Sequence, residues 1–181
     1  MTDKRMVGKQ APRFELDAIL PDQSFGKVSL EMIMKEDKWT LLFFYPMNFS
    51  TVCPTEIIAF SDAYDSFKEL NTEIVGISTD TIHSHKAWTS MDRDNKGIGS
   101  LAYPLAADPS HHVSKEYGVL VEEEGINLRG LYIISPVGEL LYAQVNHHDI
   151  GRSIPHTLMT LQALQTDGLC PANWQPGDET L

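Results

Sequence analysis

The stretch FFYPMNFSTVCPTE, residues 43–56, changes its pattern at a cysteine. The apolar, aromatic run at residues 39–45 ends at Pro46, which is typical of a buried strand. After Cys53, apolar residues recur every three or four positions at Ile57, Phe60, Tyr64 and Phe67. This spacing predicts an amphipathic helix, and Pro54 suits its first turn, where a missing N–H is harmless. The sequence therefore predicts that Cys53 lies where a strand and a loop lead into a helix N-terminus.

Strand and helix patterns alternate along the rest of the chain. Strands are predicted at residues 74–78, 104–107, 131–134 and 140–145, the last two as a hairpin. Helices are predicted at residues 83–94, after an Asp108 cap and after Ser153. This order predicts an α/β fold of three layers around a central mixed sheet. We expect one domain at residues 1–166 and a mobile C-terminal tail at 167–181.

Composition excludes several classes of function. The 181 residues include 25 acidic and 14 basic ones, so the formal charge is −11. Such a charge repels phosphate backbones and anionic membranes, and we expect neither nucleic acid nor a membrane as a partner. The first sixteen residues lack the apolar segment of a secretory signal, and no run approaches the ~18 apolar residues of a membrane span. A soluble, cytoplasmic protein is therefore expected.

The chain has two cysteines, Cys53 and Cys170. In a reducing cytosol such residues are more often catalytic or redox-sensing than structural, and their spacing does not suit a zinc site. A helix N-terminus favours the reactive thiolate, so Cys53 is predicted to be a nucleophile. Pro46 can shield its sulfur, and Ser50 can reach both the thiolate and a substrate oxygen. Taken alone, the cysteine also leaves open an inert buried thiol.

The segment PMNFSTVCPTE resembles the P-x-x-x-(T/S)-x-x-C active-site loop of the peroxiredoxins, which are thiol peroxidases with a thioredoxin-like fold. The other matching segments are GKQAPRFEL at 8–16, VGISTD at 75–80, HKAW at 85–88, YPLAAD at 103–108, EYGVL at 116–120, LRGLYII at 128–134, DIGRS at 149–153 and CPANW at 170–174. They cover nearly the whole chain and are most similar to the typical two-cysteine class, which includes the bacterial alkyl hydroperoxide reductases. The resemblance implies a thioredoxin-like fold with an N-terminal extension, and an antioxidant enzyme that reduces hydrogen peroxide and organic hydroperoxides.

The resemblance also implies roles for individual residues. Cys53 is the peroxidatic cysteine, whose thiolate attacks a peroxide oxygen and becomes a sulfenic acid. Pro46 shields it, Ser50 hydrogen-bonds the peroxide, and Arg129 stabilises the thiolate and the charge that develops on the leaving oxygen. Most of the family has threonine in place of Ser50, so we expect a working but slightly looser site.

Three further residues are implied by the same resemblance. Glu56 and Arg152 match positions that support the arginine and the loop. Cys170 matches the resolving cysteine, which condenses with the sulfenic acid. In the typical class this disulfide joins Cys53 of one chain to Cys170 of its partner, which requires a homodimer; rings of five dimers, or decamers, are common. A thioredoxin or a dedicated flavoprotein reductase would then reduce the disulfide, and no cofactor or metal is implied.

Two other functions are considered. A thiol-disulfide relay normally carries a C-x-x-C motif, whose second cysteine would stand where this chain has Glu56. A holdase chaperone or a peroxide-signal relay on the same scaffold stays open as an additional activity. Preference among peroxides cannot be predicted from the motif, since one hydroxyl and one guanidinium accept any of them.

Overall fold

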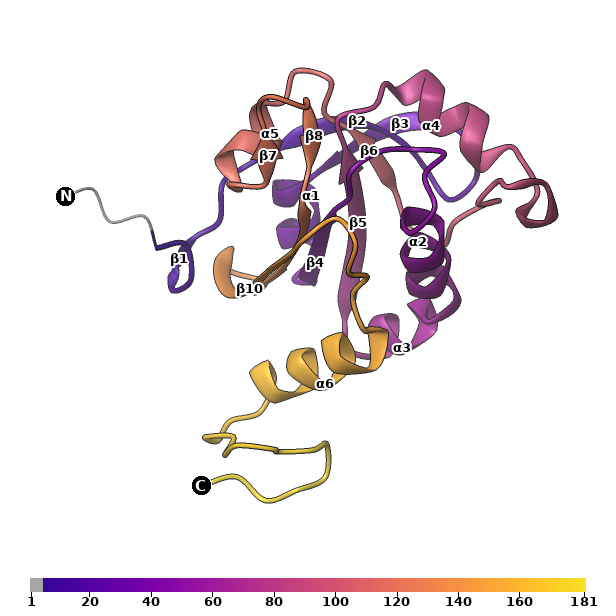
Figure 1. Ribbon diagram of the computed structural model, residues 1–181. Coiled ribbons are helices and arrows are strands. Elements are labelled where there is room, and N and C mark those ends of the chain that lie inside the picture. The colour runs from indigo at the N-terminus through magenta and orange to yellow at the C-terminus, as the bar shows by residue number, and fades with distance from the viewer. Residues whose placement is uncertain (1–4) are drawn as a thin grey trace.

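The computed structural model describes residues 5–181 and contains an eight-stranded mixed sheet in the order β1-β10-β9-β4-β5-β6-β2-β3 (Figure 1). Its strands are β1 (Lys9–Gln10), β2 (Glu15–Ile19), β3 (Phe25–Ser29), β4 (Trp39–Phe44), β5 (Thr72–Ser78), β6 (Leu105–Ala107), β9 (Arg129–Ile134) and β10 (Glu139–Asn146). A separate two-stranded ribbon pairs β7 (Leu120–Val121) with β8 (Ile126–Asn127). The helices are α1 (Leu30–Lys35), α2 (Cys53–Asp62), α3 (Tyr64–Glu69), α4 (Ile82–Thr89), α5 (His112–Glu116) and α6 (Ile154–Leu164), with a 3₁₀ turn η1 at Arg93–Asn95.

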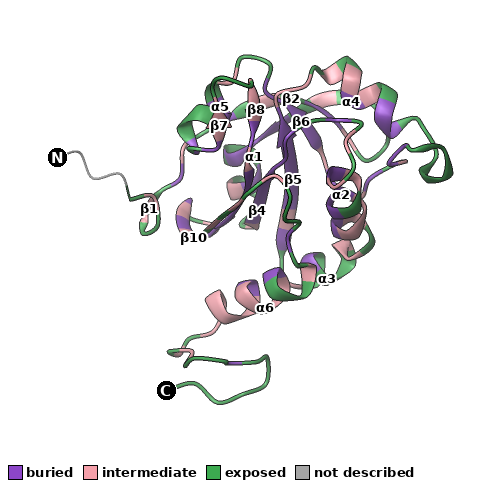
Figure 2. Cartoon of the chain, in the orientation of Figure 1, coloured by how far each residue is buried: buried purple, intermediate pink, exposed green. Residues whose placement is uncertain are grey.

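The sheet is covered on both faces, as the predicted three-layer α/β fold requires. Strand β4 runs parallel to β5 and antiparallel to β9, and its side chains alternate between two cores. Leu42 and Phe44 belong to the core that includes residues of α1 and α5. Leu41 and Phe43 belong to the core that includes residues of α2, α3, α4 and α6. Figure 2 shows the central strands as buried along most of their length, which confirms the predicted fold class.

The predicted strands are confirmed as β4, β5, β6, β9 and β10, and the predicted hairpin between β9 and β10 is confirmed as well. In the turn of this hairpin, the Ser135 N–H donates to the Glu139 carbonyl at 2.9 Å, and Gly138 adopts a φ of +83°. Ser153 caps α6, as predicted, by accepting from the His156 N–H. No strand or helix was predicted for residues 9–35, which contain β1 to β3 and α1.

Three helix predictions need correction. The helix that begins at Cys53 stops at Asp62, and α3 starts at Tyr64, so the apolar stripe covers two helices. The helix predicted at residues 83–94 ends at Thr89 and is followed by η1. Asp108 does not cap α5, which begins at His112; its carboxylate instead accepts from the Ser114 N–H and hydroxyl, both at 2.8 Å.

The C-terminal residues leave the body of the domain beyond α6 (Figure 1). Within this segment Trp174 is buried, with 8% of its surface exposed, and its indole N–H donates to the Asp178 carbonyl. The division into a domain at 1–166 and a tail at 167–181 stays a prediction, and residues 1–4 lie outside the described residues. Within residues 5–181, no helix is both long enough and apolar enough to cross a membrane.

Gly76 provides a test of the packing around β4. A Cβ atom at this position in β5 would lie 2.7 Å from Phe43 Cζ and 3.1 Å from Leu105 Cδ1. We expect Gly76→Ala to lower the free energy of unfolding by about 1–3 kcal/mol, because the added methyl group overpacks the core. In urea titrations the control Gly26→Ala should lose less, since its Cβ meets only the half-buried Leu20 side chain. Equal losses would contradict this account of the core.

Candidate active site

Cys53 is the first residue of α2, and this predicted position is confirmed. Val52 precedes the helix and Pro54 lies in its first turn. The cysteine is a free thiol with no exposed surface. Its sulfur therefore sits at the positive end of the α2 helix dipole.

Arg129 reaches this sulfur from the neighbouring strand. The antiparallel pairing of Phe43 with Leu131 places Arg129 at the end of β4 where the active-site loop begins. Its Nη1 lies 3.3 Å from Cys53 Sγ, and its Nε donates to the His148 carbonyl at 2.7 Å. The side chain is only 3% exposed, so the charge is held in a dry environment, where electrostatic interactions are strong.

Glu56, one helical turn after Cys53, lies between two arginines. Its Oε2 accepts from Arg129 Nη1 at 2.6 Å and from Arg152 Nη2 at 2.9 Å. Its Oε1 accepts from Arg152 Nε and from the Arg152 backbone N–H, both at 2.7 Å. The carboxylate is thus fully hydrogen-bonded in a buried site, which is the condition under which a buried charge is tolerated.

Arg152 extends this network into the sheet. Its Nη1 donates to the Phe44 carbonyl at 2.7 Å and to the Gly130 carbonyl at 2.6 Å. Its guanidinium also lies over the Phe43 ring, 5.2 Å from the centroid. The structure therefore brings together Cys53, Glu56, Arg129 and Arg152, as the resemblance implied, and joins them to the ends of β4 and β9.

Pro46 and Ser50 lie on the loop that connects β4 to α2. Pro46 is buried at the end of the strand, whereas Ser50 is half-buried. The Ser50 hydroxyl donates to the Met47 carbonyl at 3.2 Å. Within the described part of the chain it has no hydrogen bond to Cys53. The loop thus carries both residues, and the Met47 carbonyl engages the Ser50 hydroxyl.

A hydrogen-bond network that was not predicted from the sequence anchors this loop. The Asn48 N–H donates to Asp80 Oδ2 at 2.9 Å, and its amide oxygen accepts from the Tyr45 hydroxyl at 2.8 Å. The Asn48 amide nitrogen donates to Ser84 Oγ at 2.8 Å and contacts His85 Nδ1 at 3.0 Å. Asn48 is 5% exposed, so these bonds satisfy an otherwise costly buried amide. A histidine three positions before Trp88 on the buried side of a helix was the available sequence signal.

His85 is the titratable member of this network. Its Nε2 lies 3.0 Å from the Ala106 carbonyl and so carries the proton, which leaves Nδ1 to accept from Asn48. Burial lowers the pKa of His85 and so favours the neutral ring. Burial also raises the pKa of Tyr45 well above its usual value, which keeps its hydroxyl a donor. Burial thus favours the uncharged forms of His85 and Tyr45 in this network.

Cys170 is not brought to Cys53 within one chain. Both cysteines are free, and Cys170 is half-buried on the segment beyond α6. Its thiol lies 3.7 Å from the Ala163 carbonyl and 3.5 Å from Thr166 Oγ1.

The His147 ring lies 3.3 Å from Asp149, and no group of three or more possible metal ligands gathers anywhere in residues 5–181.

Comparisons with known proteins agree with this geometry. The model of the AhpC/TSA family matches residues 7–143, and that of the C-terminal domain of 1-Cys peroxiredoxin matches residues 161–181, where this chain carries Cys170. The chain is 65% identical over 178 residues to the putative peroxiredoxin YkuU of Bacillus subtilis, covering 98% of this chain and 99% of that protein. It is 46% identical over 183 residues to the chloroplastic 2-Cys peroxiredoxin BAS1 of Spinacia oleracea, covering 99% and 68%. The crystal structure of reduced Plasmodium vivax 2-Cys peroxiredoxin superposes with a TM-score of 0.93 at 38% identity, covering 97% and 92% of the two chains.

Glu56→Gln tests the charge network. The substitution keeps the shape of the side chain but leaves two buried guanidinium groups without a counter-charge, so we expect a loss of about 3–5 kcal/mol in the free energy of unfolding. Glu31→Gln removes the exposed pair with Lys35 and serves as the control, with an expected change below about 1 kcal/mol. Similar losses in the two variants would show that Glu56 is not a structural anchor.

The burial of His85 predicts that the folded state loses stability in acid. Because burial depresses the pKa of the folded state below the unfolded value of about 6.5, the unfolded state takes up the proton first. Stability should be full above about pH 6.5 and fall as the pH drops below it, by at most about 1.4 kcal/mol per pH unit. Urea titrations between about pH 5 and pH 7.5 span the unfolded pKa. Over this range the free energy of unfolding of His85→Gln should change less with pH than that of the parent. The variant of the exposed His83, His83→Gln, should show the same pH dependence as the parent. If His85→Gln also showed the pH dependence of the parent, His85 would not be the cause of the acid sensitivity.

Proposed function

The chain belongs to the AhpC/TSA family of peroxiredoxins, which are thiol peroxidases, and from that premise we propose how its own residues perform the reaction. The Cys53 thiolate attacks one oxygen of a hydroperoxide, an S–O bond forms and the O–O bond breaks. Cys53 becomes a sulfenic acid, and the leaving oxygen takes up a proton and departs as water or an alcohol. The observation that carries this proposal is the 3.3 Å contact between Arg129 Nη1 and Cys53 Sγ at the start of a helix.

Arg129 stabilises two negative charges in this step, one on the thiolate and one on the leaving oxygen. Its guanidinium favours the thiolate before attack and donates to the oxygen on which charge develops as the O–O bond breaks. Glu56 accepts from the same Nη1 at 2.6 Å, so the guanidinium is already oriented before the peroxide arrives. Arg152 holds Glu56 in turn and acts as a positioning residue.

Ser50 and Pro46 supply the loop side of the site. The Ser50 hydroxyl must leave the Met47 carbonyl to bind a peroxide oxygen, which a rotation of its side chain allows, since serine is freer at χ1 than threonine. Pro46 keeps water from the sulfur. Because Cys53 has no exposed surface, the loop must shift for a peroxide to reach it.

The second step joins two subunits. We assign Cys170 as the resolving cysteine: its thiol attacks the Cys53 sulfenic acid of a partner subunit, an S–S bond forms and water leaves. The free state of both cysteines and the place of Cys170 beyond α6 support an intersubunit bond. In this proposal residues 1–166 form the peroxidase domain and the tail at 167–181 serves the partner in a homodimer, or in a decamer of such dimers.

The cycle closes by thiol-disulfide exchange with an external dithiol. A thioredoxin or a dedicated flavoprotein reductase is the proposed reductant, and hydrogen peroxide and organic hydroperoxides are the proposed substrates. A reducing compartment such as the cytoplasm suits an enzyme whose two cysteines must return to thiols.

The first test measures how fast the fully reduced protein consumes hydrogen peroxide. We expect a second-order rate orders of magnitude above that of a free thiolate, lost in Cys53→Ser and about 10²–10³-fold lower in Arg129→Gln. Cys170→Ser should keep the fast first step. A parent rate like that of an ordinary thiol would refute the proposed peroxidase mechanism.

The disulfide is tested by mixing variants. After one equivalent of peroxide, the parent should run as a linked dimer on non-reducing gels, whereas Cys53→Ser and Cys170→Ser alone should not. A mixture of the two reduced variants, allowed to exchange subunits, should regain a single intersubunit link. A disulfide confined to one chain, seen by intact mass, would contradict the assignment.

A further inference from the structure

The proposed reaction needs a proton at the leaving oxygen, and the charged groups around the Cys53 sulfur do not supply one. Arg129 donates hydrogen bonds, but a guanidinium keeps its protons in proteins. Both oxygens of Glu56 accept from arginine N–H groups, so this carboxylate has no proton to give. Cys53 has no exposed surface, which keeps bulk water away from its sulfur. The reaction therefore calls for a proton donor near Arg129.

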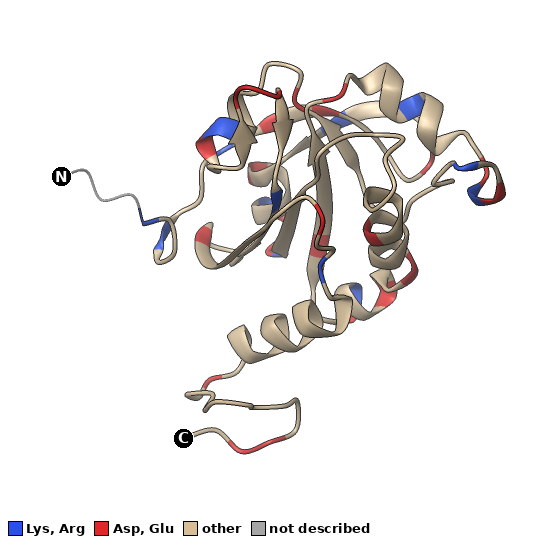
Figure 3. Ribbon diagram, in the orientation of Figure 1, with Lys and Arg blue, Asp and Glu red and all other residues tan. Residues whose placement is uncertain are grey.

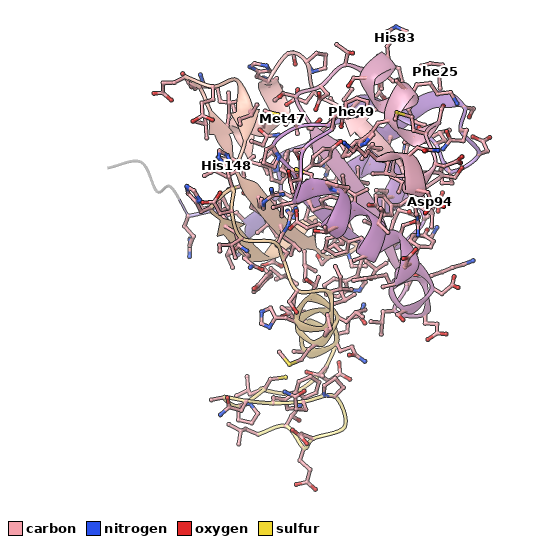
Figure 4. The ribbon with its side chains drawn as sticks, turned by 45° about the vertical axis from the view of Figure 1, so that its right-hand side comes forward. Phe25, Met47, Phe49, His83, Asp94 and His148 are labelled. Atoms are coloured by element: carbon pink, nitrogen blue, oxygen red, sulfur yellow. The ribbon has the colours of Figure 1, made fainter. Side chains whose placement is uncertain are left out.

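His148 lies beside Arg129, in the segment between β10 and α6 (Figure 4). Its carbonyl accepts from Arg129 Nε at 2.7 Å, which fixes the residue next to the guanidinium. Its ring nitrogen Nε2 is buried and has no hydrogen-bond partner among residues 5–181. A buried polar atom without a partner is costly, and in a native protein it calls for an explanation such as a catalytic role.

The two nitrogens of this ring lie in different surroundings. Unlike Nε2, Nδ1 is not buried, and it has no hydrogen-bond partner in the described part of the chain. Neutral imidazole carries a proton on one nitrogen and can take up another proton on the other nitrogen. The His148 ring can therefore accept a proton from solvent at Nδ1 and release one into the interior at Nε2.

A second unpartnered polar group lies close to Arg129 in the chain. Asn127, two residues before it at the end of β8, has no exposed surface, and neither its amide oxygen nor its amide nitrogen has a partner within residues 5–181. Strands β9 and β10 pair Arg129 with Asn146, and two residues further the same register sets Asn127 opposite His148. An amide and an imidazole nitrogen that both lack partners can hold a water molecule between them, since a buried water needs several polar partners.

The charged groups near the His148 ring leave it free to exchange protons. The His147 ring lies 5.5 Å away between centroids, and its Nδ1 is 3.3 Å from Asp149. Asp149 and Arg152 are the charged residues of the segment between β10 and α6 (Figure 3), and Arg152 is held by Glu56. No carboxylate in residues 5–181 forms an ion pair with His148.

We propose that His148 supplies the proton that the leaving oxygen takes up, through a water molecule held by Asn127. The S–O bond forms and the O–O bond breaks as in the proposed reaction. The leaving oxygen takes a proton from the held water, Nε2 gives its proton to that water, and Nδ1 takes one from solvent, which leaves the ring neutral. This inference rests on the proposed peroxidase function and deepens it, and Asn127 serves in it as a positioning residue.

The test compares peroxides whose leaving groups differ in their need for a proton. Hydrogen peroxide and tert-butyl hydroperoxide release hydroxide or alkoxide, which must be protonated, whereas peracetic acid releases acetate, which stays ionised at neutral pH. The reduced full-length protein is mixed rapidly with each peroxide. We expect His148→Leu to lower the second-order rate about 10²-fold for the hydroperoxides and by less than about threefold for peracetic acid. Asn127→Leu should show the same pattern with a smaller loss.

Two further variants separate proton transfer from structure. His147→Leu, at the exposed neighbouring histidine, is the matched control and should leave all three rates unchanged. His148→Gln keeps a polar side chain that cannot relay a proton, so it should show the pattern of His148→Leu. An equal fall for all three peroxides in His148→Leu, or no fall for any, would overturn the inference while fast reduction of hydrogen peroxide by the parent still upheld the peroxidase. A slow parent rate with all three would instead count against the proposed function itself.

Discussion

The buried carboxylate of Glu56 is the interaction on which the rest of the site depends. It accepts from Arg129 and from both the side chain and the backbone of Arg152, all within 2.9 Å. Two guanidinium groups without this anion would repel each other in a dry interior. The Glu56 carboxylate ties the first turn of α2 to the ends of β4 and β9 through Arg152. It also holds Arg129 Nη1, the nitrogen that lies beside the Cys53 sulfur.

The two sides of the cysteine are held by different chemistry. On the sheet side, ionic groups fix the guanidinium, and their strength in a buried site resists movement. On the loop side, Asn48 donates its backbone N–H to Asp80 and bonds to His85 through its amide. Hydrogen bonds between neutral groups contribute only about 0.5–1.5 kcal/mol net each. This difference suits the proposed cycle, in which the loop must shift to admit peroxide and expose a sulfenic acid while the oxyanion donor stays in place.

The same loop borders a pocket of about 530 Å³ beside the start of α2. Phe49 and Ser50, which are neighbours on the loop, both line it. A motion that exposes Cys53 therefore also reshapes the pocket wall. Cys170, on the segment beyond α6, takes no part until the sulfenic acid has formed.

The sequence by itself determined the local features of this protein. The change of apolar period placed Cys53 at a helix start, Ser153 marked the beginning of α6, and the turn after β9 predicted the hairpin, because each depends on residues a few positions apart. The residue types around the cysteine also allowed the family resemblance. Tertiary structure alone decided that Arg129 reaches a sulfur 76 positions away and that Arg152 grips a carboxylate 96 positions away. Those contacts follow from the order and register of β4 and β9 in the sheet, which set long-range distances that no local pattern encodes. The break at Ala63, the true start of α5 and the buried Asn48 network escaped prediction for the same reason, since packing and distant hydrogen bonds override local propensity.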